Sequence, residues 1–309
     1  MTHWFSPRVL ATKMAIWNTS HSIGAGLVLV LCGYLADLNW RLCFFVPAAM
    51  AIAGALVLLT TLRDSPEAVG LPEPEGSQIG GSRTKTAEGA PSGGEQGAAA
   101  EESESFWSFL RTHVFGNPFI WIVAVANFFV YTVRYAVLDW GPTLLHEAKG
   151  FEIHNTGWMV AVFEVAGIVG MLVSGWLTDN IFGGRGARTC LFYMAMSTLA
   201  VLLFWKLPGE SMAASVALLC MAGFFIYGPQ ALVGIIAANL ATKRAAATAV
   251  GLTGIFGYAS TVVSGWGLGA LVEGRGWDAG FEAMLVMGII GTVLFALAWP
   301  ARAHGYRSE

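Results

Sequence analysis

The stretch 127–140, NFFVYTVRYAVLDW, places one arginine, Arg134, and one aspartate, Asp139, inside a segment apolar enough to cross a membrane. A charge at the centre of a bilayer helix costs about 2.5–3.5 kcal/mol on insertion scales, so Arg134 needs a polar cavity or a ligand that offsets the cost. An all-α membrane protein with a functional arginine is therefore the first expectation.

The composition supports the same class. Hydrophobic residues make up 55% of the 309 residues and charged residues only 12%, and mean hydropathy is +0.61. A soluble domain carries about twice that share of charge. The formal net charge of -3 leaves no basic excess for nucleic acid. The four cysteines lie in apolar segments without CxxC spacing, so neither a disulfide framework nor a zinc site is expected. No cofactor is predicted.

A transmembrane helix needs about 20 predominantly apolar residues, and this length predicts eight transmembrane helices. They span about 13–36, 42–62, 118–142, 156–181, 188–206, 211–238, 246–272 and 279–300. Arginine and lysine gather in alternate connections, which by the positive-inside rule predicts that both termini and the central loop are cytoplasmic. That loop is rich in Gly, Ala, Ser and Glu and is expected to be a flexible tether.

The two ends of the chain resemble each other. RVLATKMAIWNTSHSIGAG begins at Arg8 and RAAATAVGLTGIFGYAS at Arg244, and a turn ending in Trp40 or Trp277 follows 32 or 33 residues later. The first two helices thus look like copies of the last two, as in transporters made of two similar halves. The prediction is two helices of the N-terminal half in 1–63, a linker with an interfacial helix in 64–116, and a six-helix C-terminal half in 117–309.

Five stretches resemble the organophosphate:phosphate antiporters of the major facilitator superfamily. They are WFSPRVLATKMAIWNTSHSIGAG, NFFVYTVRYAVLDWGPTLL, VFEVAGIVGMLVSGWLTDNIFGGRGAR, FFIYGPQALVGI and KRAAATAVGLTGIFGY, in the family's order. The resemblance implies the major facilitator fold, with the family's first four helices lacking. It also implies exchange of an organic phosphate ester for inorganic phosphate by alternating access in the cell inner (plasma) membrane.

The resemblance also implies roles for individual residues. Arg134 is implied as a phosphate-binding arginine with Tyr131 one turn earlier, and His21 with Asn18 as the contribution of the N-terminal half. Glu164 and Asp139 match acidic positions near the site that form salt bridges. Since the family's other phosphate arginine lies on its first helix, a separate chain could supply that helix, or the chain could be a nonfunctional fragment.

The chemistry of these residue types fits a phosphate. Arginine donates two parallel hydrogen bonds to a phosphate and stays charged, and histidine titrates in the same pH range as a phosphate monoester. The loop GWLTDNIFGGRGAR resembles the superfamily's cytoplasmic signature, and its Asp179, Arg185 and Arg188 are expected to act in gating. Gly175 is expected to permit a close helix contact.

Glycerol 3-phosphate is the favoured substrate, because the stretch VGLTGIFGY carries no charge where hexose-phosphate transporters carry an Asp and a Lys. WNTSH and YGPQALVGI instead resemble the hexose-phosphate group and its sensor relative, so those two functions stay open. No GxSxG or HExxH motif is present, and the sequence does not predict an enzyme.

Overall fold

The computed structural model describes residues 4–5, 7–63, 66–72, 106–207, 211–242 and 245–301, and within these it is built from helices without a strand. Most of the predicted linker lies outside the described residues. The described part of the linker contains the short turn η1 (Glu67–Val69), α4 (Phe106–Leu110) and the π-helical turn η2 (Arg111–Phe115).

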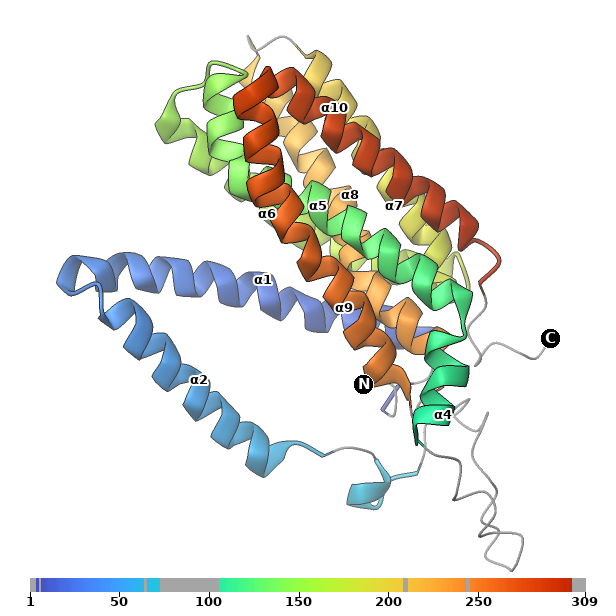
Figure 1. Ribbon diagram of the computed structural model, residues 1–309. Helices are drawn as coiled ribbons and strands as arrows, with labels where there is room; N and C mark the ends of the chain where they lie inside the picture. Colours follow the sequence, from blue (N-terminus) through green and yellow to red (C-terminus); the bar gives the residue numbers. More distant parts are fainter. Residues whose placement is uncertain are drawn as a thin grey trace, which may run out of the picture.

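Long helices account for the rest of the described chain (Figure 1). They are α1 (Pro7–Leu38), α2 (Leu42–Thr61), α5 (Pro118–Glu147), α6 (Ile153–Asn180), α7 (Gly186–Lys206), α8 (Met212–Leu240), α9 (Ala246–Val262) with the π-helical turn η4 (Val263–Gly267), and α10 (Leu268–Leu297). Six helical segments among the described residues are long and apolar enough to cross a membrane, and α1 is not one of them.

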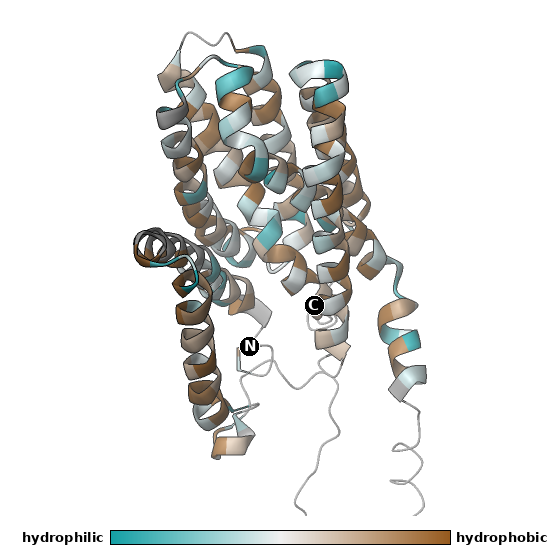
Figure 2. Cartoon of the chain, turned by 60° about the vertical axis from the view of Figure 1, so that its left-hand side comes forward, coloured by the Kyte–Doolittle hydropathy of each residue, from teal (hydrophilic) through white to brown (hydrophobic). Residues whose placement is uncertain are grey.

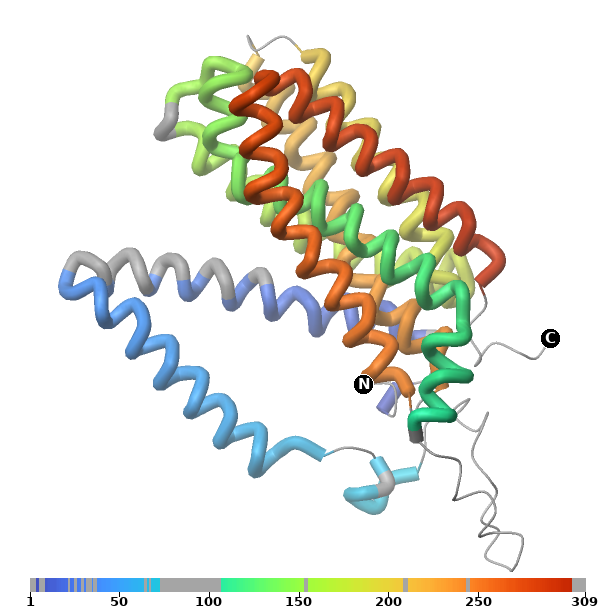
Figure 3. Tube along the Cα trace, viewed as in Figure 1, coloured from blue at the N-terminus to red at the C-terminus, as the bar shows by residue number. Residues whose placement is uncertain are grey.

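Each predicted span coincides with a long helix of the described ranges, in the predicted order, but the first predicted span, on α1, is not among the segments long and apolar enough to cross a membrane. The last membrane segment, 246–297, is continuous by hydrogen bonding but contains two predicted spans, because Gly276 has a φ of 78° and a ψ of 175°. Only glycine adopts this backbone conformation without strain. The tube in Figure 3 rises through α9 and turns back at this point before it descends through the rest of α10.

The helix ends follow from local chemistry. Asn117 caps α5 by accepting a hydrogen bond from the Phe119 N–H at 3.0 Å, and Pro118 occupies the first helical position, where its missing N–H costs nothing. Ser211 caps α8 through the Ala214 N–H. Asn39 stabilises the turn between α1 and α2 through the Arg41 N–H. The turn before Trp40 and the turn before Trp277 thus both exist, as the sequence repeat predicts.

The core lies among α5 to α10. Glycines allow its helices to approach at backbone distance: a Cβ on Gly170 would lie 1.8 Å from the Phe224 carbonyl oxygen, and one on Gly223 would lie 2.2 Å from that of Phe163. Close approach through small residues is typical of membrane helices. The α6 and α8 helices therefore form the tightest pair around the site described below.

The first two helices depart from this bundle. None of α2 is buried, although its hydropathy is the highest of the six segments, and it is the strongly hydrophobic helix at the lower left of Figure 2. In α1, Leu10, Ala11 and Ala15 are buried, whereas Leu27 and Leu38 are exposed. Only the first part of α1 thus packs against the bundle, and Figure 1 shows its far end leaving it.

Candidate functional site

Arg134 lies in the middle of α5 and is 5% exposed. Its Nη2 donates a hydrogen bond to the Tyr227 hydroxyl on α8 at 3.0 Å, and the same atom lies 3.9 Å from Glu164 Oε1 on α6. The guanidinium also faces the rings of Tyr227, 4.6 Å from the centroid, and Tyr135, 5.1 Å away. A buried charge requires such partners, because an unpaired one is strongly destabilising.

Tyr227 links the two charged groups. Its hydroxyl accepts from Arg134 and donates to Glu164, so three side chains from three helices form one chain of hydrogen bonds. Tyr227 lies in the stretch FFIYGPQALVGI, whose sequence pattern does not predict this role. Its place before Gly228 and Pro229 marks a local irregularity of α8 but does not indicate which side chains it contacts. The Arg134 Nε is buried and has no hydrogen-bond partner among the described residues.

Tyrosine rings extend the site along α5. The centroid of the Tyr131 ring lies 5.6 Å from that of Tyr135 and 5.9 Å from that of Tyr258 on α9. Tyr131 and Tyr135 are half-buried, and Tyr258 is exposed. The arrangement offers a cation, several hydroxyls and apolar ring faces within one region between α5, α8 and α9.

The predicted residues of α1 lie on another side of this region. Asn18 Nδ2 donates to the Ala231 carbonyl of α8 at 3.3 Å, so Asn18 contacts the helix that also carries Tyr227. His21 lies three residues further along α1, and its side chain is exposed. The structure therefore brings Arg134, Tyr131 and Glu164 together, and it connects Asn18 to α8. The role of His21 in substrate binding stays a prediction.

The four predicted gating residues differ in their surroundings. Asp139 is exposed on α5, next to Trp140. Asp179 accepts hydrogen bonds from the backbone N–H and the hydroxyl of Thr12 on α1, at 2.7 and 2.5 Å. Arg185 precedes α7, and Arg188 faces the Trp299 ring at 4.6 Å. A pairing of Asp179 with an arginine stays a prediction for another conformation.

The expected close contact at Gly175 is confirmed. A Cβ on this residue of α6 would lie 2.7 Å from the Ala15 Cβ and 2.9 Å from the Ala11 carbonyl oxygen of α1. The contact lies one turn from Asp179. Glycine, two alanines and one carboxylate therefore join α1 to α6 at the end of the bundle where α1 begins.

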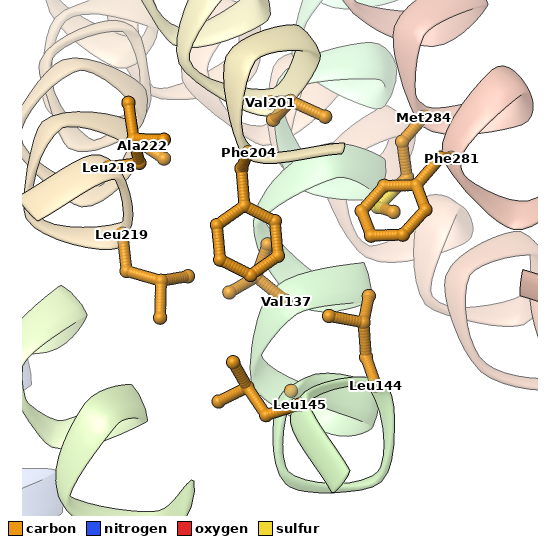
Figure 4. A pocket seen from close by; sticks show the side chains of 11 residues that line it. Val137, Leu144, Leu145, Val201, Phe204, Leu218, Leu219, Ala222, Phe281 and Met284 are labelled. Carbon is orange, nitrogen blue, oxygen red and sulfur yellow. The ribbon is translucent and has the colours of Figure 1, made fainter. Parts of the chain in front are cut away.

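A separate pocket between α5, α7, α8 and α10 has a different chemistry (Figure 4). Its eleven lining residues are all apolar or glycine, and Phe204, Phe281 and Met284 point into it. Such a lining has no donor for a phosphate.

Lys149 lies at the edge of this pocket, with Nζ 5.0 Å from the Phe204 ring and 5.9 Å from the Phe281 ring. It donates to the carbonyls of Trp205 and Leu207 at 3.2 and 2.6 Å. Burial lowers the pKa of Lys149, and Asp278 opposes that shift.

Comparison with known proteins agrees with these features. The profile of the Major Facilitator Superfamily matches residues 1–265. The chain is 38% identical to the glycerol-3-phosphate transporter of Bacillus subtilis, over 97% of this chain and 66% of that protein. It is 35% identical to a probable hexose phosphate transport protein of Chlamydia pneumoniae, over 100% of this chain and 68% of that one. It is 33% identical to the membrane sensor protein UhpC of Salmonella typhimurium, over 95% and 64%.

The chain thus spans about two thirds of the length of the curated relatives it matches. The match covers nearly all of this chain, including the helices that carry Arg134, Glu164 and Tyr227. The buried arginine, the helical architecture and these relatives agree on a multi-helix integral membrane protein of a transporter family rather than an enzyme. The chain belongs to the Major Facilitator Superfamily and, within it, to the organophosphate:phosphate antiporter family.

Proposed function

We propose that this chain forms part of a transporter that exchanges an organic phosphate ester, glycerol 3-phosphate in the first place, for inorganic phosphate. The observation that carries the proposal is Arg134, a guanidinium buried in an apolar helix with a hydroxyl and a carboxylate as its partners. A phosphate brings two charges and several acceptors to such a group, and it can replace Glu164 as the counter-ion of Arg134.

The exchange mechanism would follow from that replacement. Without phosphate, Arg134 and Glu164 compensate each other across α5 and α6. Phosphate binding changes which groups satisfy the arginine, and a ligand shifts a conformational equilibrium only through such differential contacts. The contact of α1 with α6 at Thr12, Gly175 and Asp179 is the element that would open and close at one side of the membrane. His21 on α1 would contribute from the N-terminal half, residues 1–63, to the same substrate.

The test is phosphate exchange by the full chain in proteoliposomes. Arg134→Lys keeps the charge but removes the planar fork, so exchange should fall by at least two orders of magnitude, as expected when a bidentate contact to the substrate is lost. Arg41→Lys, at an exposed position between α1 and α2, is the matched control and should exchange phosphate like the wild type. Full exchange by Arg134→Lys would refute the proposal.

Two other substrates or roles have support from the relatives. The probable hexose phosphate transport protein and the membrane sensor protein are nearly as similar to this chain as the glycerol-3-phosphate transporter is. Competition between glycerol 3-phosphate and hexose 6-phosphate for labelled phosphate distinguishes the two transport functions. A sensor would bind phosphate ester in detergent but would show no counterflow in proteoliposomes.

A further inference from the structure

Asn127, on α5, is a buried polar residue with one unsatisfied atom. It is 4% exposed, and its Nδ2 donates to the Thr253 carbonyl oxygen of α9 at 2.9 Å. A carbonyl oxygen only accepts, so the nitrogen of the amide must face it and Oδ1 must point elsewhere. That Oδ1 is buried and has no hydrogen-bond partner among the described residues. A buried acceptor of this kind is destabilising unless it meets a donor, which a ligand hydroxyl or a water can supply.

The position of Asn127 connects it to the site. Seven residues, about two helical turns or 10 Å, separate it from Arg134, so the two side chains leave α5 on the same face with Tyr131 between them. A Cβ on Gly257 of α9 would lie 2.6 Å from Asn127 Nδ2 and 3.5 Å from two ring atoms of Tyr131. The absent side chain at Gly257 thus lets Asn127 and Tyr131 pack side by side against α9.

A second unsatisfied acceptor comes from α8. Gln230 lies three residues after Tyr227, its side chain is near that of Tyr131, and its Oε1 is buried without a partner among the described residues. Two amide oxygens from two helices therefore adjoin Tyr131, while the donors of Arg134 lie further along the same face. The site offers donors at one end and acceptors at the other.

We propose that Asn127, assisted by Gln230, determines specificity by accepting hydrogen bonds from hydroxyl groups of a polyol phosphate whose phosphate binds Arg134. This inference rests on the proposed function. Amide oxygens attract O–H donors and repel a carboxylate, so a phosphate ester with a carboxylate in place of the hydroxyls is disfavoured. Because Oδ1 has no exposed surface, the proposal requires the neighbouring Tyr131 ring to move before a hydroxyl can reach it.

The experiment compares the affinities of two ligands, for the wild type and for a variant of Asn127. Glycerol 3-phosphate and propyl phosphate compete with labelled inorganic phosphate for the purified full chain, because propyl phosphate lacks the hydroxyls but keeps the phosphate. The wild type should bind glycerol 3-phosphate about tenfold more tightly than propyl phosphate, the factor expected for one or two hydrogen bonds. Asn127→Ala should reduce this ratio to about two and leave the affinity for inorganic phosphate unchanged.

Gln230→Met is the second variant and should change the ratio in the same direction. Asn117→Ala is the matched control, because Asn117 Nδ2 also bonds a carbonyl, that of Leu240, but its Oδ1 already accepts from Phe119. An equal loss of affinity for all three ligands, or an unchanged ratio, would overturn the role of Asn127. Absence of phosphate binding by the wild type would instead overturn the proposed function.

Discussion

The carboxylate of Asp179 on α6 bonds both the backbone N–H and the hydroxyl of Thr12 on α1, although 167 residues separate them in the chain. A carboxylate that receives two donors is held more strongly than a neutral acceptor. Beside it, Gly175 lets α1 approach α6 at backbone distance. The two helices are therefore joined by one charged group and by close packing.

A double-mutant cycle tests this contact. Asp179→Asn and Thr12→Val should each lower the free energy of unfolding in detergent by about 1–3 kcal/mol, and the double variant should lose less than the sum of both. Thr19→Val is the control, since the Thr19 hydroxyl bonds the Ile16 carbonyl of its own helix. Additive losses would mean that the two residues act independently.

Tyr227 can be separated from a second buried tyrosine. Tyr227→Phe removes a hydroxyl that serves Arg134 and Glu164 at once, so it should cost about 1–3 kcal/mol of stability in thermal unfolding. Tyr193→Phe should cost nothing or stabilise, because the buried Tyr193 hydroxyl has no partner among the described residues. A larger loss for Tyr193→Phe would contradict the role assigned to the Tyr227 hydroxyl.

The glycines of α6 allow a steric test on one helix. Gly170→Ala places a Cβ 1.8 Å from a backbone oxygen of α8, so the backbone has to move. The variant should lower the free energy of unfolding by about 1–3 kcal/mol or more. Gly157→Ala meets nothing within 4 Å and should be neutral, or stabilising by up to about 1 kcal/mol. Thermal unfolding of both variants in one detergent decides the prediction, and equal melting temperatures would refute it.

Much of this arrangement could be predicted because it depends on local rules. Length and hydropathy predict the spans, and the cost of a charge in a bilayer singles out Arg134. The contact at Gly175 follows from the tendency of small residues to mark helix interfaces. Each of these features depends on the residues of a single segment.

The partners could not be predicted, because they depend on which helix faces which. A tyrosine in an apolar helix is most often a packing residue, so nothing in the sequence gives Tyr227 its place between Arg134 and Glu164. Asn127 begins the stretch that decides the fold, but its unsatisfied oxygen is defined only by Thr253 on α9. The same holds for Thr12, which the sequence pattern does not connect to Asp179.

Lys149 gives a prediction for pH. It lies outside the membrane segments, and burial lowers its pKa in the folded protein below the ordinary value of about 10.4. The folded state therefore releases the Lys149 ammonium proton more readily than the unfolded state does. Lys149 adds stability as pH rises from the lowered pKa toward the ordinary one.

The melting temperature of the wild type relative to Lys149→Met should thus increase with pH over this range. A difference for Lys149→Met that falls with pH would show that Lys149 is stabilised in its charged form by the carbonyls of Trp205 and Leu207 more than burial opposes it.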